Sequence, residues 1–401
     1  MKIKNKELKF WYLFDFGLSA YPTLILTFFY ATFYVNNIAI NEIKGASEWG
    51  FTISLSSLFT AIILMTFLNN RIFNLKKKIS INYFFFFFYT ICLSVSMLFF
   101  FDSKEYQILP LLFILISFIS FEILNLFYNV TLHMVAKKKY QGSASNIGWA
   151  FGYFGGLCAL GTVFLMLLNN NLNLLPFIFS INFVGPFIAI WVILFCYPLL
   201  NIMKNKYLQI SEDLKIFSFF LNKKIKNFIF SYFFFNNAII SVFAFASLYA
   251  SSIYGLKQEK ILILGVLINL SGVLGCSLFA LFEKKIKSEK NIYKCLVALT
   301  LLTLALLIIE KVSFFWIISL LIGFFIGPIQ ASSRSFLSTN ISSVNQFSNF
   351  SIYCVIGNIC SILGPFSIGI LIHLTDSLRL GFLLIPIYFF IGLIFLKKIS
   401  A

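Results

Sequence analysis

The sequence predicts an all-α integral membrane protein of twelve helices. Its composition is 60% hydrophobic and only 11% charged, whereas about one quarter of the residues of a soluble domain are charged. A soluble fold of 401 residues cannot hide this much apolar surface, because its exterior must still be polar. Apolar runs of about 20 residues, the length that crosses the core of a bilayer, recur along the chain. Lipid is therefore the solvent that this sequence fits.

The apolar runs fall into two sets of six, with a longer polar segment between them. The first set is expected at 10–36, 50–69, 79–101, 108–135, 145–168 and 175–200, and the second at 228–254, 260–282, 292–309, 313–334, 347–372 and 380–396. The segment 201–227 is polar and basic, and we expect a linker loop there with a short amphipathic helix near 214–221. The predicted domains are a six-helix half at 1–200, this linker, and a six-helix half at 228–401.

The charges of the loops predict the orientation of the spans. If both termini are cytoplasmic, 25 of the 31 Lys and Arg residues fall in cytoplasmic segments and six fall outside. The cytoplasmic loops of membrane proteins carry this kind of excess, so we expect both termini and the linker in the cytoplasm. The formal charge of +17 therefore belongs to loops beside a membrane and does not indicate a nucleic-acid partner.

The sequence lacks the signals of enzymes and metal sites. The seven cysteines are scattered, and no two of them form a CxxC pair. Most lie inside apolar runs, where free cysteine typically packs as a small core residue. Neither a P-loop nor an HExxH zinc motif occurs. We therefore expect no enzyme, no metal and no cofactor, and the partners that remain are the lipid bilayer and a small-molecule substrate.

Two halves of six helices joined by a long cytoplasmic loop resemble the major facilitator superfamily, whose halves pack as repeats and rock about a central site. The loop after the second span reads LNNRIFNLKKK, and the loop after the eighth reads FEKKIKSEK. Both are similar to the acidic-then-basic motif of that superfamily, although Asn70 stands where the first copy would have its acid. The resemblance implies the twelve-helix major facilitator fold.

Three stretches resemble one branch of that superfamily, the vacuole effluxer-like family, which includes a fungal vacuolar amino-acid exporter. They are WYLFDFGLSAY at 11–21, FEILNLFYN with SASNIGWAFGYFGG between 121 and 156, and GPIQASSRSF, ILGPFSIG and DSLRLG between 327 and 381. Leu18 replaces the family's usual Asn, and His133 follows Leu132 where the family has a Leu-Pro pair. The resemblance implies secondary active transport by rocking of two halves, and it leaves the substrate open.

Ionisable residues inside a span cost about 2.5–3.5 kcal/mol on insertion scales, so each one is a functional candidate. Glu122 lies about halfway along the fourth span, and Asn125, Asn129 and His133 follow it on one helical stripe. We expect Glu122, Asn125 and Asn129 to couple protons or to bind the substrate. The alternative is an interhelical hydrogen bond that only holds the bundle together. His133 fits an interfacial position better than a site.

The first span carries Asp15 and Ser19 one turn apart, with Pro22 following them. We expect Asp15 to be a cytoplasmic gate residue paired with a basic residue such as Arg334. The alternative is an acid that favours a helix N-terminus. Ser19 shares its face, and Pro22 is expected to kink the span because proline removes a backbone donor inside a helix.

Polar residues also mark the seventh and tenth spans. Asn237 lies in the seventh span beside Asn236, and Gln330 and Arg334 lie four residues apart at the expected end of the tenth. The superfamily resemblance implies that both helices line a central cavity. Arg334 either binds a substrate carboxylate or, as terminal arginines do, extends to the lipid headgroups.

The fifth span carries Gly148, Gly152 and Gly156 at intervals of one turn, with Gly155 beside them. Glycine lets another helix approach closely because it has no Cβ. We expect these four glycines to pack against another helix, and the glycine-bearing eighth span is the expected partner.

These observations predict a secondary active transporter of a small polar organic solute, with amino acids as the first choice and H⁺ as the coupling ion. Sugars, peptides or drug-like solutes are the alternatives on the same fold. A membrane-embedded lipid-handling enzyme or flippase is the alternative of a different class. We expect a monomer in the inner membrane of a bacterium.

Overall fold

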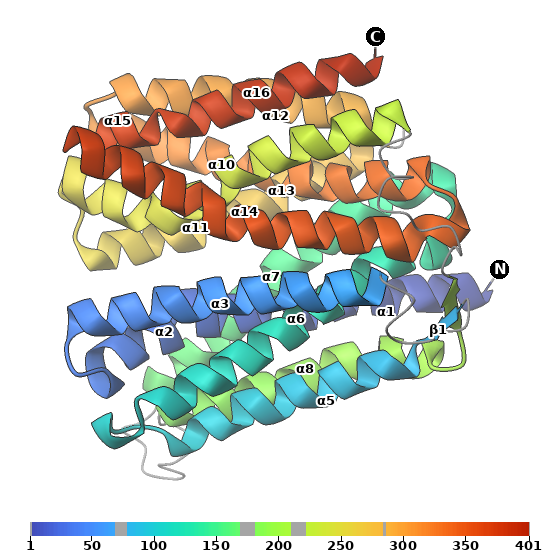
Figure 1. Cartoon of the computed structure of the whole chain (residues 1–401), viewed down its shortest axis with the longest axis horizontal. Helices are drawn as coiled ribbons and strands as arrows, with labels where there is room; N and C mark the ends of the chain where they lie inside the picture. The colour runs from blue at the N-terminus through green and yellow to red at the C-terminus, as the bar shows by residue number, and fades with distance from the viewer. Residues whose placement is uncertain (1, 69–77, 169–180, 210–221, 284–285, 401) are drawn as a thin grey trace. The chain divides into compact units, whose positions relative to one another are not determined.

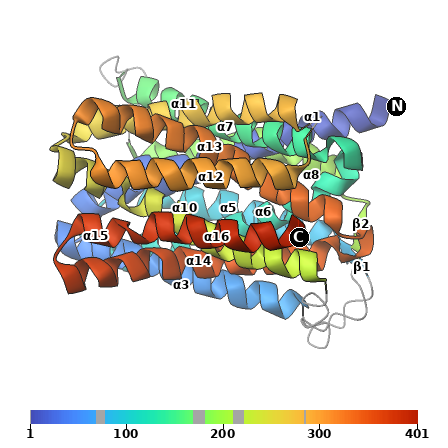
Figure 2. The same cartoon turned by 90° about the horizontal axis from the view of Figure 1, so that it is seen from above.

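The computed structural model describes residues 2–68, 78–168, 181–209, 222–283 and 286–400, and almost all of them are helical (Figures 1 and 2). The long helices are α1 (Lys2–Leu18), α3 (Glu42–Leu68), α5 (Asn82–Met97), α6 (Ile108–Val135), α7 (Gln141–Leu168), α8 (Val184–Met203), α10 (Lys223–Tyr254), α11 (Gln258–Phe282), α12 (Ser288–Ile308), α13 (Val312–Asn340), α14 (Gln346–Thr375) and α16 (Leu384–Ser400). The short helical segments are η1 (Pro22–Phe28), α2 (Tyr30–Phe33), η2 (Tyr34–Ile38), η3 (Leu98–Phe100), η4 (Lys104–Tyr106), η5 (Lys138–Tyr140), η7 (Ile181–Phe183), η8 (Ser343–Asn345) and α15 (Leu378–Phe382). Two short strands, β1 (Lys78–Ser80) and β2 (Tyr207–Gln209), complete the described elements.

Within the described residues, twelve helical spans are long and apolar enough to cross a membrane. They correspond one to one with the twelve predicted spans, which confirms the all-α membrane fold. The tenth span is longer than expected, because α13 continues past 334 to Asn340. The first residues of the predicted sixth span, at 175–180, and the linker helix predicted near 214–221 lie outside the described residues.

The first span changes its helix type partway across. The α-helix α1 ends at Leu18, and the π-helix η1 begins at Pro22, followed by α2 and a second π-helix, η2. Proline has no backbone donor and its ring crowds the preceding turn, so a wider π turn accommodates it. The helix type thus changes at Pro22, and the predicted kink itself stays a prediction. Asp15 and Ser19 consequently lie just before an interrupted stretch of helix.

The chain divides into two compact units, and the first comprises Met1–Leu64, Asn74–Thr131 and Phe151–Gln209. In this unit α1 and α5 both pack along α8. At Gly185 a side chain would collide with the backbone of α5, so this glycine permits the close approach of α5 and α8. The strands β1 and β2 pair antiparallel, with Ile79 opposite Leu208, next to the start of α5 and the end of α8.

The second unit comprises Met65–Phe73, Leu132–Ala150 and Ile210–Ala401. In this unit α10 packs on α14 and α16, α13 packs on α11 and α12, and α12 packs on α16, as Figures 1 and 2 show. Successive helices run in opposite directions, so α10 and α12 begin at the end of the unit where α11 and α13 terminate. The segment Leu132–Ala150, at the junction of α6 and α7, groups with this unit although it precedes the predicted linker in sequence.

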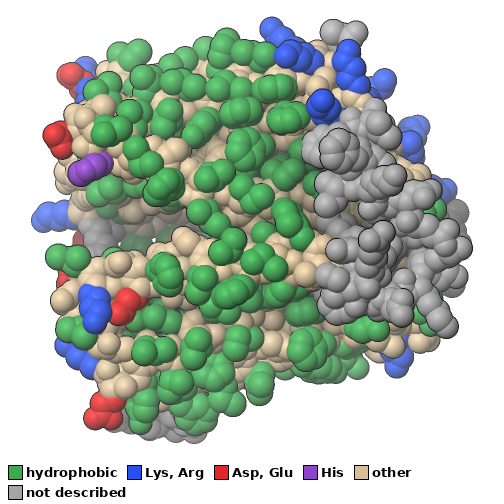
Figure 3. All heavy atoms as spheres, in the orientation of Figure 1, with side chains coloured by type: hydrophobic (Ala, Val, Ile, Leu, Met, Phe, Trp, Pro, Cys, Tyr) green, Lys and Arg blue, Asp and Glu red, His purple; other side chains and the backbone are tan. Residues whose placement is uncertain are grey.

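The outer face of the helices is strongly apolar. Large side chains such as Phe86, Leu194 and Phe366 are 65%, 61% and 64% exposed. In Figure 3 hydrophobic side chains cover the flanks of the helices, and the charged side chains in view gather where helices end. Exposed apolar surface of this extent would drive a soluble protein to aggregate. It matches the hydrocarbon of a bilayer.

Candidate functional site

The second unit buries a cluster of uncharged polar side chains between α10, α13 and α14. Asn236 on α10 is 4% exposed, and its Oδ1 accepts a hydrogen bond of 3.0 Å from Nε2 of Gln330 on α13. A buried amide is tolerated when it is hydrogen-bonded in this way. Because each amide carries both donors and acceptors, the pair can also bind a polar solute.

Asn237, the neighbour of Asn236, lies in the same cluster. Its Nδ2 donates hydrogen bonds to the backbone oxygen of Phe233 at 2.6 Å and to Sγ of Cys360 at 3.2 Å. Its Oδ1 and the hydroxyl of Ser241 are buried without a hydrogen-bond partner in the described part of the chain. Gly364 on α14 faces both groups, and a Cβ there would lie 2.8 Å from the Ser241 hydroxyl. Unsatisfied buried polar atoms are costly and call for a functional explanation.

Two stacked tyrosines border the amide pair. The rings of Tyr232 on α10 and Tyr353 on α14 have centroids 4.0 Å apart and planes inclined by 25°. A Cβ on Gly357 would lie 3.1 Å from the Tyr232 hydroxyl oxygen and 3.9 Å from Nδ2 of Asn236. The absence of a side chain at Gly357 therefore leaves the phenol and the amide next to each other. Stacked phenols combine apolar ring faces with polar hydroxyls.

Arg334 lies one turn beyond the amide pair on α13 and is 3% exposed. Its Nε donates to Oγ of Ser145 at 2.9 Å, and a terminal nitrogen donates to the backbone oxygen of Ser145 at 2.8 Å. The Ser145 hydroxyl donates to the backbone oxygen of Ala331 at 2.6 Å, and the guanidinium lies 5.9 Å from the ring centre of Trp149. The alternative in which Arg334 extends to the headgroups is wrong, because α13 continues well past it and buries it.

In the first unit, Glu122, Asn125 and Asn129 lie on one side of α6 and are each partly exposed. A neighbouring side of α6 packs against α1. There Nε1 of Trp11 donates to the backbone oxygen of Tyr128 at 3.0 Å, and the two rings stack with centroids 4.1 Å apart. The helix therefore has one packed aromatic face and one accessible polar face. The role of the polar face in coupling or binding stays a prediction.

Asp15 and Ser19 meet α7 at a glycine. The Ser19 hydroxyl donates to Oδ1 of Asp15 at 3.3 Å. A Cβ on Gly152 would lie 2.8 Å from the Ser19 hydroxyl oxygen and 3.0 Å from Oδ1 of Asp15. The absence of a side chain at Gly152 leaves room for a carboxylate and a hydroxyl between α1 and α7. The pairing of Asp15 with Arg334 stays a prediction.

Gly155 and Gly156 bring α7 close to α1. A Cβ on Gly155 would overlap the backbone of Phe16, and a Cβ on Gly156 would lie 2.5 Å from Oγ1 of Thr23. Within the first unit, Gly155 therefore serves the contact of α7 with α1, and Gly156 its contact with η1.

The eighth span, which we expected as the partner of the α7 glycines, makes its own glycine contact in the second unit. A Cβ on Gly275 of α11 would overlap the backbone of Phe324 on α13. Gly148 lies on α7 within the segment that belongs to the second unit. Its packing role stays a prediction.

Sequence reasoning gave no role to Ser145 or to Glu283. A lone serine on a helix carries no signal until its partner is known. Glu283 was recognisable as the acid that opens the FEKKIKSEK motif. It is 7% exposed, and one of its carboxylate oxygens accepts a hydrogen bond of 2.7 Å from Ser332. Burial raises the pKa of Glu283, and hydrogen bonds, the one from Ser332 first, oppose part of that rise.

The groups gathered in the second unit are amides, hydroxyls, phenols and a guanidinium. These groups suit reversible binding of a polar solute rather than bond-breaking chemistry. Among the residues that the structure describes, no group of three or more His, Cys, Asp or Glu side chains could hold a metal ion.

Comparisons with known proteins agree with this geometry. The family described as "Vacuole effluxer Atg22 like" matches residues 135–401. The uncharacterized MFS-type transporter YxiO of Bacillus subtilis (strain 168) is 25% identical over 415 residues, covering 99% of this chain and 95% of YxiO.

Solved structures show the fold alone, because their sequence identities are low. The human organic anion transporter MFSD10 has a TM-score of 0.76 at 10% identity, with 98% of this chain and 99% of MFSD10 covered. The proton:xylose symporter XylE has a TM-score of 0.72 at 11% identity, with 99% of this chain and 94% of XylE covered. The fold is that of the major facilitator superfamily.

Proposed function

Because the chain belongs to the vacuole effluxer Atg22-like family and has the major facilitator fold, we propose that it is a proton-driven secondary transporter of small polar organic solutes, amino acids first among them. The family and the fold are those of membrane transporters and not of enzymes. The chain is a multi-pass membrane protein, and its Bacillus relative agrees with a bacterial inner membrane.

The observation that carries the solute class is the buried amide cluster of the second unit. Asn236 and Gln330 offer neutral donors and acceptors in the membrane interior, and Arg334 adds a positive charge one turn away. An amino acid presents a carboxylate to a guanidinium and further polar atoms to amides. The unpartnered Oδ1 of Asn237 is an acceptor that suits the ammonium group. A purely apolar solute would leave the buried Oδ1 of Asn237 without a hydrogen-bond partner among the described residues.

The support for proton coupling comes from the first unit. Glu122 lies midway along a membrane span, on the accessible face of α6 beside Asn125 and Asn129. A carboxylate in the membrane interior is expensive, and protonation removes the charge. A site that gains and loses a proton during each cycle can therefore couple its occupancy to a pH gradient.

The transport cycle that we propose is a rocking motion of the two halves of the sequence in a monomer with both termini in the cytoplasm. Small residues at the contact between α1 and α7 let helix backbones touch directly, which suits helices that shift against one another. The interrupted first span adds a place where the backbone can bend. Discontinuous helices are a common feature of transporter sites.

The test is solute uptake into proteoliposomes with an imposed pH gradient, using wild type, Glu122→Gln and the control Glu105→Gln. Glu105 is an exposed carboxylate in η4, between two spans. We expect the gradient to drive amino-acid uptake in wild type and in Glu105→Gln, and at least tenfold less in Glu122→Gln. Gradient-driven uptake of a sugar and of no amino acid would overturn the solute class. Equal uptake by Glu122→Gln and wild type would overturn the coupling residue.

A further inference from the structure

The second unit contains a cavity of about 540 Å³ that is separate from the amide cluster. It lies where α10 and α12 begin and where α11 and α13 end, and the η5–α7 junction closes another side. Its volume falls within the range of small-molecule pockets, about 300–1,000 Å³. The cavity is larger than a single small ion requires.

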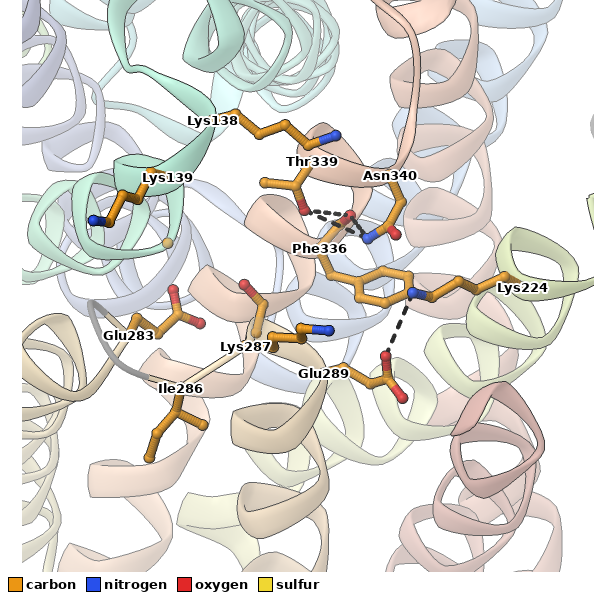
Figure 4. A pocket seen from close by; sticks show the side chains of 12 residues that line it. Lys138, Lys139, Lys224, Glu283, Ile286, Lys287, Glu289, Phe336, Thr339 and Asn340 are labelled. Atoms are coloured by element: carbon orange, nitrogen blue, oxygen red, sulfur yellow. Dashed lines mark hydrogen bonds and ion pairs between the residues drawn. The ribbon is translucent and has the colours of Figure 1, made fainter. Parts of the chain in front are cut away.

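Four lysines line this cavity: Lys138, Lys139, Lys224 and Lys287. Figure 4 shows the side chains of Lys138, Lys224 and Lys287 reaching from three different elements toward the space around Phe336, whereas Lys139 points away. The Nζ of Lys224 lies 5.4 Å from the ring centre of Phe336. Ammonium groups that converge from separate helices repel one another unless an anion lies between them.

Among the described residues that line the cavity, two carboxylates stand against these four lysines. Glu289 is 3.6 Å from Nζ of Lys224, so it balances one positive charge. Glu283 is 7% exposed and its Oε1 accepts a hydrogen bond from Ser332. The lining therefore has an excess of positive charge. The first turn of α12 begins at Ser288 in the same wall, and the N-terminal end of a helix adds further attraction for an anion.

Glu283 supplies a second, different feature of the lining. Its Oε2 is buried without a hydrogen-bond partner among the described residues. A Cβ on Gly142 would overlap this oxygen, so the glycine leaves the space that the carboxyl group occupies. Glu283 is one of the residues that line the cavity, and a small turn of its carboxyl group would let this acceptor take a hydrogen bond from a ligand with a hydroxyl or an amino group.

We propose that this cavity binds a phosphate ester that carries a hydroxyl or amino group: the lysines hold the phosphate, and Glu283 accepts a hydrogen bond from the donor group. Lysine is a common point-charge partner of phosphate in proteins. The same chemistry occurs in a soluble phosphorylated metabolite and in the headgroup of an anionic phospholipid. Basic pockets between the ends of membrane helices bind such headgroups.

The binding test uses glycerol 3-phosphate and inorganic phosphate as probes of the full-length purified protein in a phosphate-free buffer. Affinity is measured for wild type, Lys287→Gln, Lys138→Gln and Glu283→Gln. The control is Lys290→Gln, which removes an equal charge from an exposed position on α12 outside the cavity. We expect each cavity lysine variant to bind glycerol 3-phosphate about fivefold more weakly, and the control to bind as wild type does.

Glu283→Gln tests the role of Glu283 separately from that of the lysines. We expect it to lose the preference for glycerol 3-phosphate over inorganic phosphate, because only the ester carries alcohol hydroxyls that can reach Glu283 while the lysines hold its phosphate. Failure of both probes to bind, together with no binding of phosphatidylglycerol, would overturn the proposal. An equal loss in Lys290→Gln would also overturn it, because that result indicates general charge and not a site.

The source of the ligand is decided in nanodiscs. If the natural ligand is a lipid, glycerol 3-phosphate will not bind in phosphatidylglycerol nanodiscs, because the lipid fills the cavity. It will bind in phosphatidylcholine nanodiscs. A soluble ligand would bind equally in both. Each result supports the cavity as a phosphate-ester site and assigns its occupant.

Discussion

The two units build the same kind of helix contact with different side chains. In the first unit, Asp15 on α1 and Ser19, one turn further and just past the end of α1, face a glycine of α7. In the second unit, Asn237 and Ser241 lie one turn apart on α10 and face a glycine of α14. The two arrangements differ chiefly in one group, a carboxylate in the first unit and a carboxamide in the second.

This difference follows the burial of the two residues. Asn237 is 2% exposed, whereas Asp15 keeps part of its side chain accessible. A carboxylate is tolerated in a span where water or another polar group can reach it. A neutral amide is also tolerated at a position that water does not reach. At these two matched positions, therefore, the partly accessible site carries the titratable carboxylate and the fully buried site carries the neutral amide.

The largest expected effect comes from moving the charge into the second unit. Asn237→Asp has nearly the same shape but places a carboxylate at a buried position within a span. We expect it to lower the free energy of unfolding by roughly 2.5–3.5 kcal/mol, the cost of a central aspartate on insertion scales. Thermal unfolding in detergent measures the change. The reverse variant, Asp15→Asn, is expected to unfold within about 1 kcal/mol of wild type, and equal losses in both would contradict the comparison.

A second prediction concerns the glycines that permit these contacts. Gly155→Ala would place a methyl group on the backbone of Phe16, and backbone cannot move aside as a side chain can. Overpacking of this kind costs about 1–3 kcal/mol. Gly161→Ala on the same helix meets nothing within 4 Å and is the matched control. Unfolding temperatures that fall equally for both variants would show that loss of glycine itself, and not the contact with α1, is responsible.

A smaller difference is expected between the two serines. Ser19→Ala removes a hydrogen bond to Asp15 and is expected to cost about 0.5–1.5 kcal/mol. Ser241→Ala removes a buried hydroxyl that has no partner among the described residues, so we expect no loss or a slight gain in stability. Chemical or thermal unfolding of the two variants ranks them. A greater loss for Ser241→Ala would mean that its hydroxyl is satisfied in the membrane-embedded protein.

The smallest expected effect concerns Glu283, the buried carboxyl group of the second unit that lies just outside the spans. The pKa of Glu283 is raised by burial, so folding favours its protonated form. The contribution of protonated Glu283 to the stability of the folded state is complete below the ordinary glutamate pKa of about 4.3. It is lost as the pH rises through the raised pKa of the folded state. The effect is modest because hydrogen bonds oppose the rise.

The measurement is the unfolding temperature of wild type, Glu283→Gln and Glu259→Gln across this pH range. Glu259 is an exposed carboxylate at the other end of the same helix. We expect wild type and Glu259→Gln to lose stability as pH rises and Glu283→Gln to lose less. Parallel curves for wild type and Glu283→Gln would assign the pH dependence to other groups.

Much of the fold was predictable because the length and apolarity of the spans are properties of the sequence itself. The broken first span was also predictable, since Pro22 signals it locally. The contacts of the candidate site were harder. Nothing in the sequence indicates that Ser145 holds Arg334, because the two residues lie on distant segments.

The end of α13 shows why boundaries mislead. The polar stretch after 334 marked the expected end of the span, but Ser335 and Thr339 bond back to the backbone of their own helix, and the helix continues. Arg334, placed at the expected end of the span, is therefore buried. The partner of the α7 glycines was missed for a similar reason, since glycine spacing marks a contact face without naming the helix that fills it.

The central claim, that the first unit couples the proton and the second unit binds the solute, is tested most directly by solute counterflow. Proteoliposomes preloaded with unlabelled substrate exchange it for labelled substrate without any pH gradient. We predict that Glu122→Gln keeps counterflow and loses gradient-driven uptake, whereas Gln330→Ala loses both. Loss of counterflow in Glu122→Gln, or wild-type counterflow in Gln330→Ala, would contradict this division of roles.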